Sequence, residues 1–128
     1  MPEFVASFKE LKVYQRALEA SLRIYDITDK FPPEERYRLS TQIIKSSGSV
    51  AAQITEAWRR RRNRGAFIDK LNISEGEAAE TQHWITVAYR RGYVDQGIAG
   101  ALDEEYEHIM AQLVTMIHQV DRWTLPKV

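Results

Sequence analysis

The chain has 128 residues, of which 44% are hydrophobic and 28% are charged, and this suits one domain with a buried core. Its eighteen basic and eighteen acidic residues leave no formal net charge, which argues against a uniformly basic nucleic-acid binder. Because cysteine is absent, disulfides, thiolate nucleophiles and cysteine-based zinc sites are excluded.

The first predicted helix covers residues 9–30, and the Pro-Pro pair at 32–33 stops it because proline lacks an amide donor. A second helix is predicted at 34–61, where two glutamates suit the positive end of the helix dipole. In both segments, apolar and small residues recur at alternating steps of three and four, as on one face of a helix. The expected inward seams are Val13, Ala17, Ala20, Ile24, Ile27 and Phe31, followed by Leu39, Ile43, Ser46, Ser47, Val50, Ile54 and Ala57.

The third predicted helix covers 65–91 and ends at Gly92, and the fourth covers 99–123. Their seams are Phe67, Leu71, Ser74, Ala78, Thr81, Ile85 and Ala88, followed by Tyr106, Ile109, Leu113, Met116, Val120 and Trp123. No segment alternates with a two-residue period, so no sheet is expected. Four amphipathic helices with short connections predict an all-α, up-down-up-down antiparallel four-helix bundle, with residues 1–128 as one domain.

The first and fourth predicted helices each carry a second apolar stripe beside the seam. A helix of a lone small bundle needs only one stripe, so a second stripe indicates a further burial partner, expected to be another copy of the chain. The alternative is a single stripe that is merely wide. The two additional stripes are Leu11, Tyr14, Leu18, Leu22 and Tyr25 in the first helix, and Met110, Val114 and Ile117 in the fourth.

Five arginines gather where the second predicted helix gives way to the third. They are Arg59, Arg60, Arg61, Arg62 and Arg64. Arginine forks match phosphate oxygens, and a cluster of them releases counterions on binding, so this turn is a candidate nucleic-acid site. The alternatives are a favourable interaction with the helix dipole, or pairing with acidic residues of a neighbouring subunit. The adjacent Trp58 is expected either to stack on a base or, more simply, to pack.

Three polar residues lie on or near the inner face of the second predicted helix: Gln42, Gln53 and Glu56. Buried polar groups must find partners, so these are expected to form a structural polar core with tyrosine hydroxyls. A ligand pocket is the alternative interpretation.

Two Glu-x-x-His motifs, at residues 80–83 and 105–108, are similar to those of di-iron bundles, with the glutamates at 19 and 56 as nominal further ligands. Both motifs are expected to point outward at about 100° per residue, so no metal or other cofactor is predicted. No nucleophile–base pair and no Gly-x-Ser-x-Gly elbow is apparent, so catalytic residues, and hence an enzyme, are not expected either.

Short motifs in a fixed order run through nearly the whole chain. They include residues 8–15 (FKELKVYQ), 24–25 (IY), 31–35 (FPPEE), 42–43 (QI), 49–50 (SV), 54–56 (ITE), 80–82 (ETQ) and 92–93 (GY). In these motifs the chain resembles a bacterial family of proteins encoded by intervening sequences of ribosomal-RNA genes, with the accessory variability protein of diversity-generating retroelements as a relative. The resemblance implies a four-helix bundle, a ring-shaped homopentamer and no catalytic residues. For the retroelement relative it implies binding to a reverse transcriptase and to nucleic acid.

These observations predict a non-enzymatic, homo-oligomeric scaffold, pentameric if the resemblance holds, which docks a partner through its arginine-rich turn. The expected partners are RNA or DNA, or a ribonucleoprotein partner such as a reverse transcriptase. The alternatives are a self-assembling bundle without nucleic-acid binding and, further behind, a metal-binding bundle. No apolar run approaches the ~20 residues of a membrane span, and no signal-peptide pattern is present, so a cytoplasmic protein with no membrane partner is expected.

Overall fold

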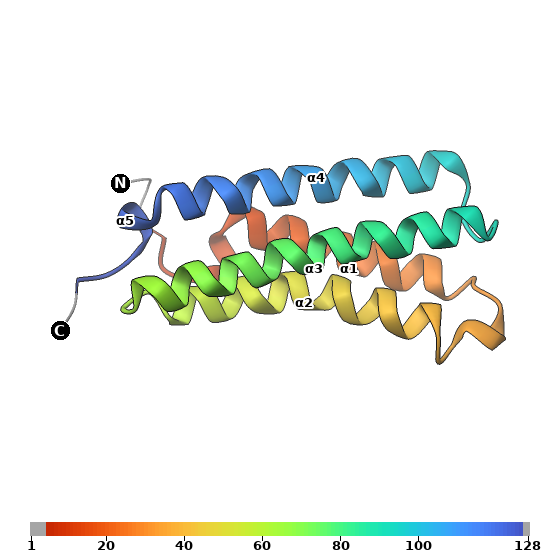
Figure 1. Ribbon diagram of the computed structural model, residues 1–128, viewed down its shortest axis with the longest axis horizontal. Coiled ribbons are helices and arrows are strands. Elements are labelled where there is room, and N and C mark those ends of the chain that lie inside the picture. Colours follow the sequence, from red (N-terminus) through yellow and green to blue (C-terminus); the bar gives the residue numbers. More distant parts are fainter. Residues whose placement is uncertain (1–4, 127–128) are drawn as a thin grey trace.

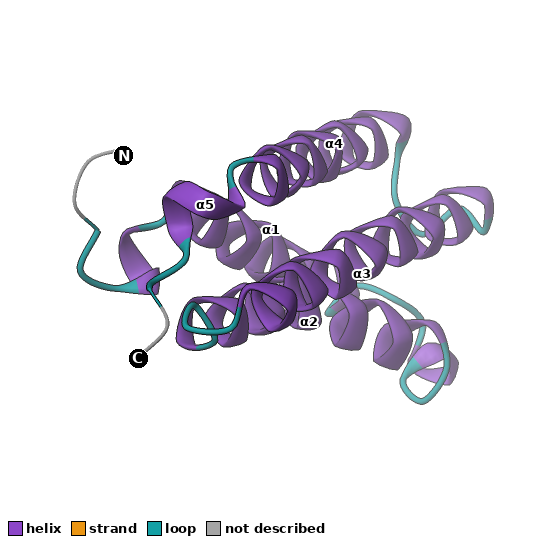
Figure 2. Ribbon diagram, turned by 60° about the vertical axis from the view of Figure 1, so that its left-hand side comes forward, coloured by secondary structure: helices purple, strands orange, loops and turns teal. Residues whose placement is uncertain are grey.

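The computed structural model describes residues 5–126 and shows four long antiparallel helices (Figure 1). α1 spans Lys12–Thr28, α2 Leu39–Arg59, α3 Arg64–Arg90 and α4 Gln96–His118. A short helix, α5 (Val120–Trp123), follows α4, and the 3-10 turns η1 (Phe8–Glu10) and η2 (Pro33–Glu35) precede α1 and α2. All regular structure in these residues is helical (Figure 2), which confirms the predicted all-α four-helix bundle. None of the described helices is both long and apolar enough to span a bilayer.

Local side-chain chemistry sets the ends of α3 and α4. Asn63 and Asp95 cap their N-termini, each accepting the amide N–H three residues further on, at 2.9 and 2.8 Å. Gly92 follows α3 with a φ of 79°, a left-handed conformation that favours glycine, and Tyr93 N–H donates back to the Ala88 carbonyl at 2.9 Å. The predicted role of Gly92 in ending this helix is therefore confirmed.

The largest boundary error concerns the second helix, which begins at Leu39 instead of residue 34. Pro33–Glu35 form a separate 3-10 turn, and the Tyr93 hydroxyl donates to the Glu35 carboxylate at 2.7 Å. This contact ties the segment to the α3–α4 connection. The predicted fourth helix starts earlier, at Gln96, and breaks at residue 119 into α4 and α5.

The core lies between all four helices. Nearly all the predicted seam residues are buried, and the two that are only half-buried are Ile27 and Trp123. α3 makes the most extensive contacts, with α2 on one side and α4 on the other, whereas α1 and α4 have the smallest contact among neighbouring long helices. The seam patterns thus identified the buried face of each helix correctly.

The second apolar stripes have different environments. On α4, Met110 and Ile117 are half-buried against the core, so this stripe is a wide core-facing flank. On α1, Leu22 and Tyr25 remain 46% and 50% exposed. Of these two stripes, the one on α1 is therefore the one that offers large exposed apolar side chains to a further partner.

Hydroxyl groups bridge the buried interface between α2 and α3. Ser46 Oγ lies 2.8 Å from Thr81 Oγ1, and Ser74 Oγ donates to the Val50 carbonyl at 2.8 Å. Thr81 Oγ1 also lies 2.9 Å from the Glu77 carbonyl. Ser46 Oγ likewise lies 3.4 Å from the Ile43 carbonyl, and either hydroxyl can be the donor within the pair.

Tyr106 carries the largest side chain among the fully buried residues, and within residues 5–126 its hydroxyl has no hydrogen-bond partner. Burial raises the pKa of this phenol well above its usual value. We expect Tyr106→Phe to raise the free energy of unfolding by about 1–2 kcal/mol, because it removes the desolvation cost of an unpaired hydroxyl. Urea unfolding measures the change, with Tyr37→Phe, at a side chain that is 85% exposed, as the neutral control. A destabilised Tyr106→Phe protein would show that the hydroxyl has a partner.

Candidate nucleic-acid interface

The five arginines lie at one end of the bundle, where α2 turns into α3, and α5 lies at the same end (Figure 1). We call them the arginine turn: Arg59 ends α2, Arg60, Arg61 and Arg62 form the connection, and Arg64 begins α3. All are exposed except Arg61, which is half-buried. The fold thus presents the sequence-predicted cluster as one local surface, but its members have different surroundings.

Arg61 is held against Trp58. Its guanidinium carbon lies 3.6 Å from the centroid of the indole ring, and its Nε donates to the Trp58 carbonyl at 2.9 Å. Burial, followed by the positive charges of Arg59 and Arg62, lowers the pKa of Arg61. Trp58 itself is buried and packs on Trp123, with ring centroids 6.4 Å apart. Trp58 is therefore a packing residue, and its outer face is covered by an ordered cation.

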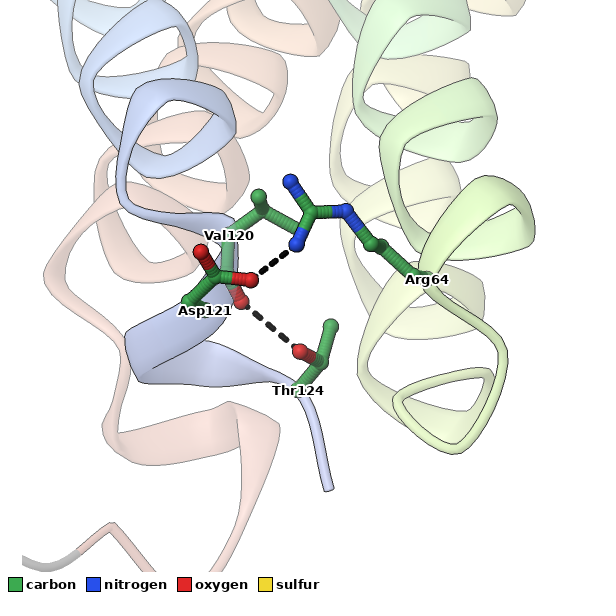
Figure 3. Close-up of polar contacts among 4 residues, drawn as sticks. All are labelled: Arg64, Val120, Asp121 and Thr124. Carbon is green, nitrogen blue, oxygen red and sulfur yellow. Dashed lines mark hydrogen bonds and ion pairs between the residues drawn. The ribbon is translucent and has the colours of Figure 1, made fainter. Parts of the chain in front are cut away.

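Arg64 forms an ion pair with Asp121 of α5 (Figure 3). The last turn of α5 is closed by Thr124, whose hydroxyl donates to the Val120 carbonyl at 2.9 Å. One residue later, Leu125 N–H donates to the Arg61 carbonyl at 2.8 Å. Residues 119–126, which we call the α5 segment, are therefore tied to the arginine turn at two points.

The remaining arginines of the turn are available to a partner. Within residues 5–126, Arg59, Arg60 and Arg62 form no ion pair. The α5 segment adds Arg122, which is likewise exposed and carries no ion pair to a described carboxylate. No sequence pattern points to Arg122, because it lies far along the chain and only the fold brings it to this end.

The prediction that three polar residues of α2 lie in the core is wrong for two of them. Gln42 and Glu56 are exposed, and Glu56 lies 3.8 Å from the amine of Lys70 at the surface. Each precedes a seam residue, and one step along a helix turns a side chain by about 100°, away from the core. Gln53 is half-buried, and its Oε1 is enclosed without a hydrogen-bond partner among the described residues. The buried polar contacts are instead the serine and threonine hydroxyls at seam positions.

The two Glu-x-x-His motifs do not converge. His83 and His108 are both exposed, and Glu80 accepts a hydrogen bond from the Trp84 indole at 3.1 Å. In the described part of the chain, no three histidine or carboxylate side chains gather in a way that could hold a metal ion. The geometry therefore gives no support to the di-iron interpretation.

A family model described as 23S rRNA-intervening sequence protein matches residues 9–115. A crystal structure of a protein of unknown function from the S23 ribosomal protein family, from Bacteroides thetaiotaomicron, is similar to this chain. The two share 30% sequence identity and a TM-score of 0.75, over 83% of this chain and 95% of the other. Among curated proteins, no sequence matches. The α5 segment lies beyond the residues that the family model matches.

Proposed function

The chain belongs to the 23S rRNA-intervening sequence protein family, and from this premise we propose that it is a non-enzymatic, homo-oligomeric scaffold. In this proposal the arginine turn docks a nucleic acid, or a ribonucleoprotein partner such as a reverse transcriptase. One observation carries the proposal: Arg59, Arg60 and Arg62 are exposed together without an ion pair within the described residues, on a chain of zero net charge. A local excess of unpaired arginines suits phosphate groups.

Assembly would strengthen a weak contact at this turn. The exposed Leu22 and Tyr25 of α1 support a second burial partner, and we propose that this partner is another copy of the chain. In a ring-shaped homopentamer, which the family resemblance implies, all copies of the arginine turn would lie around one rim. A long nucleic acid could then contact several turns at once, and the affinities would combine through a high effective concentration.

The docking proposal is tested by binding of single-stranded RNA and duplex DNA at low salt, measured by fluorescence anisotropy. The test variant replaces Arg59, Arg60 and Arg62 with serine. A matched control replaces three exposed arginines at the other end of the bundle, Arg36, Arg38 and Arg90, with serine. We expect the test variant to bind much more weakly than the wild type and the control to keep the wild-type affinity. If the wild type does not bind at low salt, the docking proposal fails and self-assembly without nucleic acid becomes the better interpretation.

The assembly proposal predicts that Leu22→Glu dissociates the oligomer, because it would bury a charge in an apolar interface. Light scattering coupled to gel filtration measures the mass, which we expect to be that of five chains for the wild type and one chain for the variant. Ile73→Glu on α3 is the matched control, since Ile73 is 38% exposed on another helix. A wild-type protein that remains monomeric at micromolar concentration would contradict the proposal.

A further inference from the structure

A hollow of about 430 Å³ lies at the end of the bundle where the arginine turn meets the α5 segment. The end of α2 and the turn after it contribute Trp58 and Arg61 to its wall, and the α5 segment contributes Arg122, Trp123 and Leu125. Small-ligand sites typically enclose about 300–1,000 Å³ and combine apolar walls with a few placed polar groups. The hollow thus has room for a flat aromatic ligand, bordered by cationic side chains.

The guanidinium of Arg61 is presented to this hollow as an ordered plane. Its guanidinium carbon lies over the Trp58 ring, 3.6 Å from the centroid, and its Nε is fixed by the bond to the Trp58 carbonyl. Arg61 is only half-buried and lines the hollow, so part of its side chain is accessible to a ligand there. The stack of Trp58 and Arg61 therefore presents a planar cationic group to the hollow.

The charges around the hollow suit an anionic strand. Arg60 and Arg62 are exposed and flank Arg61 in the chain, and Arg122 lines the hollow. The carboxylate in the wall, Asp121, is already engaged by Arg64 (Figure 3). Phosphate groups next to a bound base would thus have arginines nearby.

We infer that this hollow takes one unstacked nucleobase of a single-stranded nucleic acid, which stacks on the open face of Arg61 while the flanking phosphates contact the surrounding arginines. The inference rests on the proposed function and adds to it the class of nucleic acid. Bases of single strands commonly stack on aromatic rings and on guanidinium planes, whereas bases of a duplex are paired and stacked inside the helix. Since Arg61 is already ordered, stacking on it costs little side-chain entropy.

The first experiment uses the wild-type protein and two strands with the same phosphates. Fluorescence anisotropy compares oligothymidylate with an abasic strand of equal length, and an oligouridylate arm shows whether RNA behaves as DNA does. We expect the abasic strand to bind about tenfold more weakly, in line with the contribution of one stacked base. Equal affinities for the two strands would overturn the inference but leave phosphate docking intact. Absence of binding to every strand would overturn both.

The second experiment assigns the stacking surface. Arg61→Lys keeps the positive charge but loses the planar guanidinium, and Arg90→Lys is the matched control at an exposed arginine at the other end of the bundle. We expect Arg61→Lys to bind oligothymidylate about tenfold more weakly and the abasic strand unchanged, while Arg90→Lys changes either affinity by less than about twofold. Thermal unfolding verifies that both variants are folded. Equal effects of the two substitutions would overturn the role assigned to Arg61.

Discussion

Replacing Phe67 with alanine is expected to lower the free energy of unfolding by about 3–5 kcal/mol, the largest change in stability that we predict for a single substitution. Phe67 lies in the first turn of α3 and is fully buried. α3 packs on both α2 and α4, so a cavity in this helix removes contacts from two interfaces at once. With a total stability of about 5–15 kcal/mol for an ordinary domain, this substitution approaches the unfolding threshold.

Urea unfolding followed by circular dichroism measures the difference. Tyr89→Ala is the matched control, because this aromatic residue lies near the other end of the same helix and is 41% exposed. It is expected to change the free energy of unfolding by less than about 1 kcal/mol. A loss below about 1 kcal/mol for Phe67→Ala would show that neighbouring side chains fill the space, or that Phe67 is not packed as described.

Replacing Arg59, Arg60 and Arg62 with serine is expected to weaken nucleic-acid binding and also to make the affinity less dependent on salt concentration. Each arginine–phosphate contact contributes about −0.7 to the slope of log K against log salt for a single strand. Three contacts on one chain contribute about −2, so between about 50 and 200 mM salt the wild-type affinity falls roughly 20-fold more than that of the variant. An oligomer that engages several turns would show a larger difference.

Titrations at several salt concentrations measure this slope for the wild type, the triple variant and the control at Arg36, Arg38 and Arg90. The control is expected to keep the wild-type slope, because its three arginines lie at the opposite end of the bundle from the arginine turn. If the test variant and the control had the same slope, the turn would not be a phosphate-binding surface, and binding would reflect diffuse charge.

The fold could be predicted from the sequence because each helix repeats one buried side with a regular period. Apolar or small residues, such as Ile43 in α2 and Leu71 in α3, repeat along one face of each helix for many turns. The errors fall where tertiary contacts decide the local structure. The start of α2 depends on a turn that Tyr93 holds from the α3–α4 connection, a contact that no local pattern around Pro33 reveals.

The candidate site could be predicted only in part. Adjacent arginines are visible as a run, but the partner of Arg64 comes from a segment 57 residues later, and sequence spacing carries no information about that pairing. Arg64 pairs with Asp121 and Arg61 packs on Trp58, whereas Arg60 forms no ion pair with a described residue. The polar core was predicted at the wrong residues for a simpler reason. Glutamine and glutamate near the seam have obvious hydrogen-bonding groups, whereas a serine in the seam, such as Ser46, is interpreted only as a small side chain.

The buried hydroxyls between α2 and α3 have a consequence for how these helices are aligned. Apolar or small residues recur all along both seams, so sliding α3 by one turn against α2 would preserve much of the apolar contact. The same slide would place Ser46 opposite Ala78 or Ile85 in place of Thr81, and would separate Ser74 from the Val50 carbonyl. Each lost hydrogen bond costs only about 1 kcal/mol, but the cost applies to the shifted arrangements and not to the native one. The hydroxyls thus single out one axial position among several that hydrophobic packing alone would leave nearly equal in energy.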